Sequence, residues 1–284
     1  MFIISLILLA GCKRNQTAVP KHNINKSEVG HKIIKVFYSL PSPMEIASAF
    51  SEMEIKFNPN YLHNTNDYTK YITSTAQAIN LGIYGADLSF CCVFGQHNLT
   101  VKYFNTVKNL AQELDLMKIV NDSTLRLIEQ NLDSPYVLQQ IVSETFYKAD
   151  AYLQEADRQR EATLILTGGW VETMYLILSF LHNQNAPTNC KAYNLIADEY
   201  LVIDDLMNII KTSPMRHPKK LLSQLQPIKY NLSKLIKFRK IPVYDSITDS
   251  TYITTVIEYQ ITSMKLDSLR NSVSKLRKKF INLH

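Results

Sequence analysis

Two acidic residues, Asp87 and Glu172, stand among apolar and small residues, where an ionised carboxylate needs a partner or a shifted pKa. If the fold brings them together with Tyr84, Tyr175 or His97, the group could bind a cation, a sugar or a peptide amine. The same pair could also serve as the acid and base of a hydrolase, provided that a cleft reaches it. We favour the structural alternative, in which both side chains fix the register of packed helices, because structural networks also perturb acids.

Glycines occur near both acids, inside segments whose apolar spacing is otherwise helical. The first pair is Gly82 and Gly85, and the second is Gly168 and Gly169. Glycine inside a helix costs up to about 1 kcal/mol relative to alanine, so a close approach of another backbone should offset that cost. We therefore predict that the two helices touch at these glycines. The candidate binding residues at this contact are Tyr84, Asp87, Trp170 and Glu172.

Cysteine and histidine indicate no metal or cofactor site. Besides Cys12, the chain contains Cys91, Cys92 and Cys190. Cys91 and Cys92 are adjacent on a predicted helix and poorly placed to pair with each other, although either could meet Cys190. We favour buried free thiols, because free cysteine packs as a small hydrophobe. No histidine stands at zinc-ligand spacing from a second ligand, and no phosphate loop, serine nucleophile elbow or metalloprotease motif occurs, so we expect neither metal nor cofactor.

The elements that must position these residues are helices. Only 7 glycines occur in 284 residues, apolar residues recur mostly at spacings of three and four, and alternating runs are scarce. Asn, Asp, Ser or Pro bounds each predicted segment. The first seven predicted helices cover Ser42 to Glu54, Asp67 to Phe94, Leu99 to Leu114, Ser123 to Leu132, Pro135 to Arg160, Thr163 to His182 and Lys191 to Lys211.

The C-terminal part of the sequence continues this pattern. Pro218 to Lys240 is a further helical stretch, bent or restarted at Pro227, which cannot donate a backbone hydrogen bond. From Tyr252 to Phe280 the apolar residues alternate between spacings of three and four, which predicts the longest helix of the chain. The sequence therefore predicts an all-α fold, an irregular multi-helix bundle of antiparallel helices with a long C-terminal helix. A boundary between two sub-bundles is expected near residues 183–189.

The N-terminus carries the pattern of an export signal. The apolar run that ends at Leu9 is shorter than the roughly 20 residues of a membrane-spanning helix, and Ala10, Gly11 and Cys12 follow it. This order is typical of a bacterial lipoprotein signal, in which Cys12 carries the lipid; the lack of Lys or Arg before the run departs from the usual signal. Polar residues without apolar periodicity follow, as in a flexible tether. The predicted organisation is a signal peptide at 1–11, a tether at 12–34 and a helical domain at 35–284.

Composition limits the class of partner. Hydrophobic residues make up 46% of the chain and charged residues 20%, which excludes disorder outside the tether. The formal charge is +6, and much of it lies in residues 229–240 and 275–279. Solvated helix faces explain both runs, because no recognised DNA- or RNA-binding module accompanies them, and we expect no nucleic-acid partner.

Three sequence motifs resemble those of a known protein family. They are the runs Tyr38 to Ala47, Gly82 to Ser89 and Gly168 to Glu172. Together with the signal at Cys12, they resemble a family of helical lipoproteins of Bacteroidota for which no activity is established. The resemblance spans most of the chain and implies export and a helical fold. Because Lys13 follows the cysteine and no acidic cluster does, similarity to such lipoproteins implies the outer membrane, with the periplasmic face preferred.

Asp-Ser pairs give a further expectation of modification. Ser123, Ser246 and Ser250 each follow an aspartate, which resembles the short O-glycosylation sites of exported Bacteroidota proteins. The same pair is also an ordinary helix N-cap, so both interpretations stay open.

Two functions from different classes follow from these patterns. The leading interpretation is a lipid-anchored cell-envelope module that binds or scaffolds an envelope protein, a peptide or a glycan, held to the membrane through its N-terminal lipid. The alternative is a hydrolase that uses Asp87 and Glu172, which requires solvent access to both.

Overall fold

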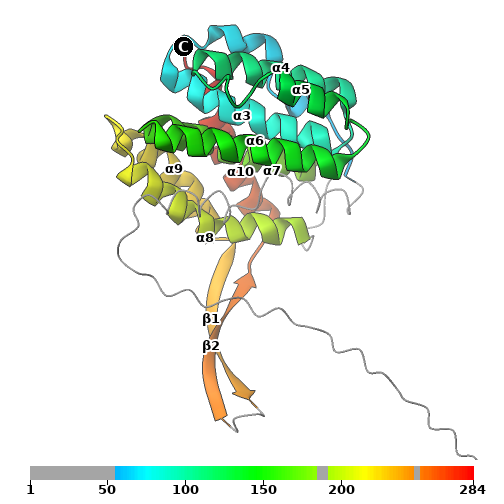
Figure 1. The fold of residues 1–284 in the computed structure, drawn as a ribbon. Coiled ribbons are helices and arrows are strands. Elements are labelled where there is room, and N and C mark those ends of the chain that lie inside the picture. The colour runs from blue at the N-terminus through cyan, green and yellow to red at the C-terminus, as the bar shows by residue number, and fades with distance from the viewer. Residues whose placement is uncertain (1–54, 184–190, 246–249) are drawn as a thin grey trace, which may run out of the picture.

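A computed structural model describes residues 55–183, 191–245 and 250–284 of the chain (Figure 1). Two short 3-10 helices, η1 (Pro59–Tyr61) and η2 (Thr65–Lys70), precede the bundle. Its helices are α3 (Ser74–Val93), α4 (His97–Glu113), α5 (Asp122–Glu129), α6 (Pro135–Glu155), α7 (Gln159–Asn183), α8 (Lys191–Thr212), α9 (Pro218–Ser233) and α10 (Ser263–Ile281). The predicted bundle of helices is confirmed, with one two-stranded hairpin added, β1 (Ile236–Asp245) and β2 (Ser250–Tyr259).

Several predictions lie outside the described residues. These are the signal and tether, the lipidation of Cys12, the helix expected from Ser42, the sub-bundle boundary, Cys190 and the modification of Ser246.

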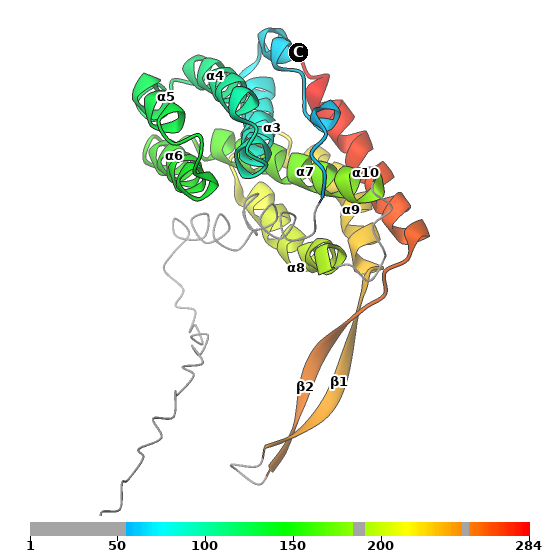
Figure 2. The same cartoon turned by 90° about the vertical axis from the view of Figure 1, so that its right-hand side faces the viewer.

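The pair α3 and α7 forms the centre of the bundle. Thr73 caps α3 by accepting a hydrogen bond from the Ala76 N–H at 3.2 Å, and every residue of α3 from Ala76 to Cys92 is buried. Figure 2 shows α4, α5 and α6 gathered on one side of this pair, and α9 and α10 on the other. Helices α8 and α10 pack against α7, and α9 packs against both α8 and α10. Residues far apart in the sequence therefore meet around α3 and α7.

Glycine allows the two central helices to touch. A Cβ atom on Gly82 would lie 1.9 Å from the carbonyl oxygen of Ile165, and one on Gly168 would lie 2.0 Å from the carbonyl oxygen of Ile79. Both distances are too short for a Cβ atom, so any other residue at either position would clash with the facing backbone. The predicted contact between the two glycine-containing helices is thus confirmed, and it is a contact of backbone against backbone.

Helix α7 is long and apolar enough to cross a membrane by length and composition, but 89% of its most apolar window is buried inside the fold. The core helix of a globular protein has the same properties. Because α7 packs against α3, α6, α8 and α10, we interpret it as the core helix of this bundle.

The hairpin corrects two sequence predictions. Helix α9 ends at Ser233 after running through Pro227 without a restart, so the helix predicted to reach Lys240 is too long. The helix predicted from Tyr252 is wrong as far as Tyr259, because this stretch is strand β2, and α10 begins only at Ser263. Threonine, isoleucine, valine and tyrosine dominate β2, and their preference for strands outweighs an apolar spacing that fits a helix by coincidence. The longest helix is α7, with 25 residues against 19 in α10.

Candidate functional site

The two predicted carboxylates do meet, and a cation from α10 joins them. Asp87 on α3 and Glu172 on α7 are both without solvent exposure. Arg277 forms a two-point ion pair with Glu172, with its Nε 2.5 Å from Oε2 and its Nη2 2.8 Å from Oε1. The guanidinium also lies over the ring of Tyr175, 4.0 Å from the ring centre. The buried ion pair therefore ties α7 to α10, and Asp87 places α3 beside it.

Asp87 is the protonated member of the cluster. Burial raises the pKa of Asp87 well above its usual range, and the nearby charge of Glu172 raises it further, against the opposing effects of Arg277 and the His63 N–H. Its Oδ2 accepts a hydrogen bond from the backbone N–H of His63 at 3.0 Å. The other carboxyl oxygen of Asp87, Oδ1, is buried and has no hydrogen-bond partner among the described residues. A protonated Asp87 avoids a second buried negative charge beside Glu172, whose carboxylate is paired with Arg277.

The cluster fastens the segment before α3 to the bundle. The His63 carbonyl oxygen accepts a hydrogen bond from the hydroxyl of Tyr103 at 2.7 Å, and its ring Nε2 lies 2.6 Å from the Tyr71 hydroxyl oxygen. The same ring stacks on Tyr84 with 5.0 Å between ring centres. Burial, reinforced by Arg277, lowers the pKa of His63 to about 4, so the ring is neutral at neutral pH. Tyr84 in turn donates its hydroxyl hydrogen to the Asn64 carbonyl oxygen at 2.7 Å.

This geometry fits a structural role. Glu172, Arg277 and the His63 ring have polar partners within the protein, and neither Asp87 nor Glu172 has the solvent access that the hydrolase alternative requires.

No family model, curated protein or solved structure matches this chain. The resemblance to helical lipoproteins of Bacteroidota stays a prediction that rests on the sequence motifs.

Trp170 belongs to a different buried contact. Its indole Nε1 donates a hydrogen bond to Glu199 Oε2 on α8 at 2.7 Å, so its polar atom does not join Asp87 and Glu172. Burial raises the pKa of Glu199 to about 7, although the bond from Trp170 opposes this rise. Sequence reasoning missed Glu199, yet a signal was present, because Glu199 stands three residues after Ile196 and four before Ile203 on the apolar stripe of α8.

Two other predicted neighbours lie elsewhere. Gly85 faces α6 and not α7, because a Cβ atom there would lie 2.2 Å from the ring of Phe146. His97 begins α4 on the surface, where its Nδ1 is 3.7 Å from the Asp133 carboxylate. Gly169 adjoins Gly82, at an ordinary contact distance.

Sequence reasoning also missed Arg277 and His63. Arg277 lies in the basic run 275–279, which we interpreted as a solvated face, although it follows Val273 by four residues on the buried side of α10. His63 stands in a segment without periodicity, so no sequence signal pointed to it.

The remaining predicted residues have separate environments. Cys91 and Cys92 are free and buried, as expected, and burial raises the pKa of Cys92 to about 12, which leaves the thiol protonated. The N-cap of α5 is Asn121, whose side chain accepts from the Ser123 N–H at 3.0 Å. Ser250 begins β2. Within the described ranges, no group of three His, Cys, Asp or Glu side chains is placed to hold a metal ion.

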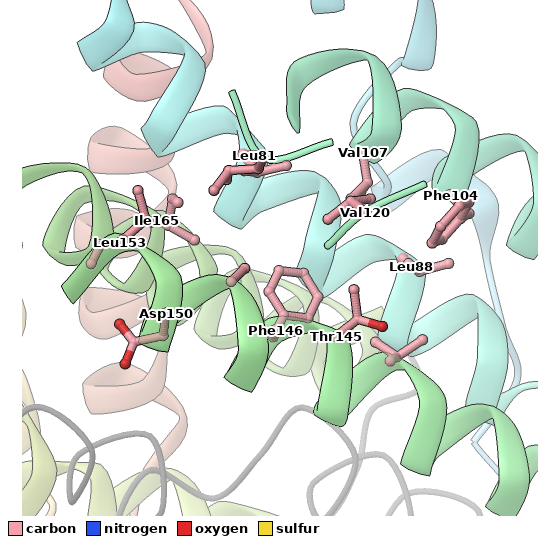
Figure 3. Close-up of a pocket in the computed structure, with 14 residues that line it drawn as sticks. Leu81, Leu88, Phe104, Val107, Val120, Thr145, Phe146, Asp150, Leu153 and Ile165 are labelled. Carbon is pink, nitrogen blue, oxygen red and sulfur yellow. The ribbon is translucent and has the colours of Figure 1, made fainter. Parts of the chain in front are cut away.

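A small apolar cavity lies between α3, α4, α6 and α7 (Figure 3). Its volume is about 20 Å³, which is close to the space of one water molecule. Asp150 borders it, and Figure 3 shows the carboxyl group pointing away from Phe146. The Asp150 Oδ1 accepts from Gln154 at 3.3 Å, and burial raises the pKa of Asp150. A cavity of this size holds no substrate.

Proposed function

We propose that this protein is a lipid-anchored binding or scaffold module of the cell envelope, and that its hairpin is the contact surface. The observation that carries this proposal is the projection of β1 and β2 away from the helical body, which both views display (Figures 1 and 2). The exposed large hydrophobic side chains on this hairpin are Phe238 (50%), Tyr244 (62%), Tyr252 (52%), Ile253 (72%) and Tyr259 (40%). Apolar groups gathered on a projecting element favour contact with another molecule.

The base of the hairpin is held firmly on the bundle. The Tyr259 hydroxyl donates to Asp198 Oδ1 on α8 at 2.8 Å, and the Gln260 N–H donates to the Leu235 carbonyl oxygen at 2.7 Å. The Lys265 ammonium adds hydrogen bonds to the carbonyl oxygens of Lys234 and Gln260, at 2.8 and 2.7 Å. An isolated two-stranded hairpin is only marginally stable, so this clamp supports the arm as a directed element.

The buried cluster supports the other half of the proposal, the attachment to a membrane. The first described segment, which follows the predicted tether and the helix predicted from Ser42, is bonded to α3, α4 and α10 through Asp87, Tyr103 and Arg277. In the proposed protein, these hydrogen bonds transmit a pulling force on the lipid anchor to the core of the bundle. The predicted address is the periplasmic face of the outer membrane.

Labelling with a clickable fatty acid tests the anchor. The full chain should incorporate the label when expressed in a Gram-negative host, and the Cys12→Ser variant should not. An unlabelled full chain, or equal labelling of both chains, would contradict lipidation at Cys12.

Site-specific photocrosslinking in the native host tests the contact surface. A crosslinking amino acid at Ile253, which is 72% exposed on the hairpin, should form protein adducts. The matched control is Ile72, which is 78% exposed just before α3. Equal adducts at both positions, or none at Ile253, would reject the hairpin as the contact surface.

A further inference from the structure

The two outer edges of the hairpin differ in composition. The strand β1 carries Lys237, Arg239 and Lys240, followed by Pro242. From Thr251 to Ile257 the strand β2 contains no charged residue, no proline and no glycine. Charges and proline are the devices by which natural edge strands avoid pairing with another chain. The β1 edge is therefore protected against pairing, and the β2 edge is open.

The register shows which backbone groups face outward. The two strands pair without a bulge from Ile236 opposite Tyr259 to Asp245 opposite Ser250. Because hydrogen-bonded and non-hydrogen-bonded pairs alternate in an antiparallel ladder, the bond from Gln260 to Leu235 fixes the alternation. The odd-numbered residues of β2 then point their N–H and C=O groups away from β1. The even-numbered residues of β1 do so on the other edge, where Pro242 removes a donor.

We propose that the β2 edge pairs with the β2 edge of a second copy of this chain, antiparallel and about a two-fold axis at Thr255. This inference rests on the proposed function of the hairpin as a contact surface and names its partner. The product is one four-stranded sheet shared by two subunits, and such a two-fold contact uses the same surface twice.

The self-complementary sequence of β2 supports a second copy as the occupant. In the register centred on Thr255, Ile253 lies opposite Ile257 of the partner subunit, and Thr251 lies opposite Tyr259 of the partner subunit. Glu258 is the acidic residue of β2. In this register it lies opposite Tyr252 of the partner subunit, so the two Glu258 side chains do not face each other. No like charges face each other, and isoleucine pairs across the strands stabilise a sheet.

The placement of the helical bodies permits this pairing. Antiparallel strands put the base of one hairpin beside the tip of the other. Because Tyr259 at one base lies opposite Thr251 of the partner subunit, the two bases are offset by eight residues, which at about 3.3 Å per residue is roughly 26 Å. The hairpin extends beyond the bundle in both views, so its edge is reached without contact between the bodies (Figures 1 and 2).

Disulfide trapping tests the register. In the full chain with Cys12→Ser and Cys190→Ser, Thr255→Cys should form a disulfide-linked dimer under mild oxidation, because directly opposite residues in a hydrogen-bonded pair lie about 5.5 Å apart at Cα. The matched control is Lys240→Cys. Lys240 pairs with Thr255 within the hairpin, but it lies on the β1 edge, away from the proposed contact. Equal trapping at both positions, or none at Thr255, would overturn the proposal.

Sedimentation over a concentration series tests the association itself. Thr255→Pro removes an outward N–H and spares the β1 ladder, as Pro242 does in the natural chain. The unaltered chain should shift from monomer to dimer, and Thr255→Pro should weaken dimerisation at least tenfold without a change in the far-ultraviolet circular dichroism spectrum. A monomer at every concentration would overturn the second copy as partner. If Ile253 still crosslinks to other proteins in that case, the proposed function stands, whereas a lack of every adduct removes both.

Discussion

Glu199 links the stability of this fold to pH at the scale of one residue. Its pKa rises from an ordinary value of 4.5 to about 7 because the carboxyl is buried between α7 and α8. The folded protein therefore holds the proton more tightly than the unfolded chain. This contribution to stability is complete below pH 4.5 and is lost as the pH rises through 7.

We expect the Glu199→Gln variant to avoid the fall in unfolding free energy above pH 7, because glutamine does not titrate. The change from 4.5 to about 7 corresponds to about 3 kcal/mol, which is an upper bound on the gain in unfolding free energy at pH 8. At pH 4 the variant and the natural chain should agree within about 0.5 kcal/mol, because the natural side chain is then neutral as well. Urea unfolding at both pH values measures this difference. An equal effect at pH 4 and pH 8 would contradict a titrating Glu199.

His63 acts in the opposite direction over a similar range. Its pKa in the folded protein is about 4, below the ordinary 6.5, so its contribution is present above pH 6.5 and is lost as the pH falls through 4. The two slopes partly cancel in the natural chain. Comparing the natural chain with the Glu199→Gln variant isolates the contribution of Glu199, because both proteins contain His63.

The assignment of the proton to Asp87 is tested by paired amide substitutions. Asp87→Asn retains an acceptor for the His63 N–H and is neutral beside Glu172, as protonated Asp87 is, so the unfolding free energy at pH 7 should change by less than about 1 kcal/mol. Glu172→Gln leaves the Arg277 guanidinium buried without a counter-charge and should cost about 3–5 kcal/mol. Chemical denaturation of both variants measures the contrast. Equal losses would place the charge on Asp87 instead.

At the scale of elements, the contact between α3 and α7 was predictable and the hairpin was not. Glycine inside an apolar helix has a physical cost, and the spacing of Gly82 and Gly168 therefore indicated a close backbone contact. Residues 252–259 satisfy both a helical spacing and the preference of β-branched residues for strands, and sequence reasoning chose the wrong one. The cluster was half predictable, because carboxylates among apolar residues are visible in a sequence, whereas the approach of Arg277 depends on how α10 packs.

The central contact gives a prediction with an internal control. Gly168→Ala would place a Cβ atom 2.0 Å from the Ile79 carbonyl oxygen, so the helices must separate, and we expect a loss of about 2–4 kcal/mol in unfolding free energy. At Gly169 the nearest atom is 3.4 Å away, and Ala is the better helix former, so Gly169→Ala should be neutral or slightly stabilising. Thermal unfolding of the two variants compares them. Similar losses would mean that the helices do not meet at Gly168.

At the scale of the whole molecule, the hairpin stands apart from the core of the bundle. The described helices bury a continuous core around α3 and α7, and the buried ion pair closes it against α10. The hairpin contributes little to that core beyond its base, where Phe238 lies 6.4 Å from Tyr200 between ring centres. We therefore propose that the apolar strand residues outside the core contact another molecule.

Excision of the hairpin tests this division most directly. Lys237 and Glu258 lie opposite each other in the register, so an Asn-Gly turn can join them in place of residues 238–257. The shortened chain should keep the helical circular dichroism spectrum and, within about 3 °C, the unfolding temperature of the bundle, and it should lose association with itself and with envelope partners. An unfolded bundle, or a shortened chain that retains all of its contacts, would contradict the hairpin as the binding element.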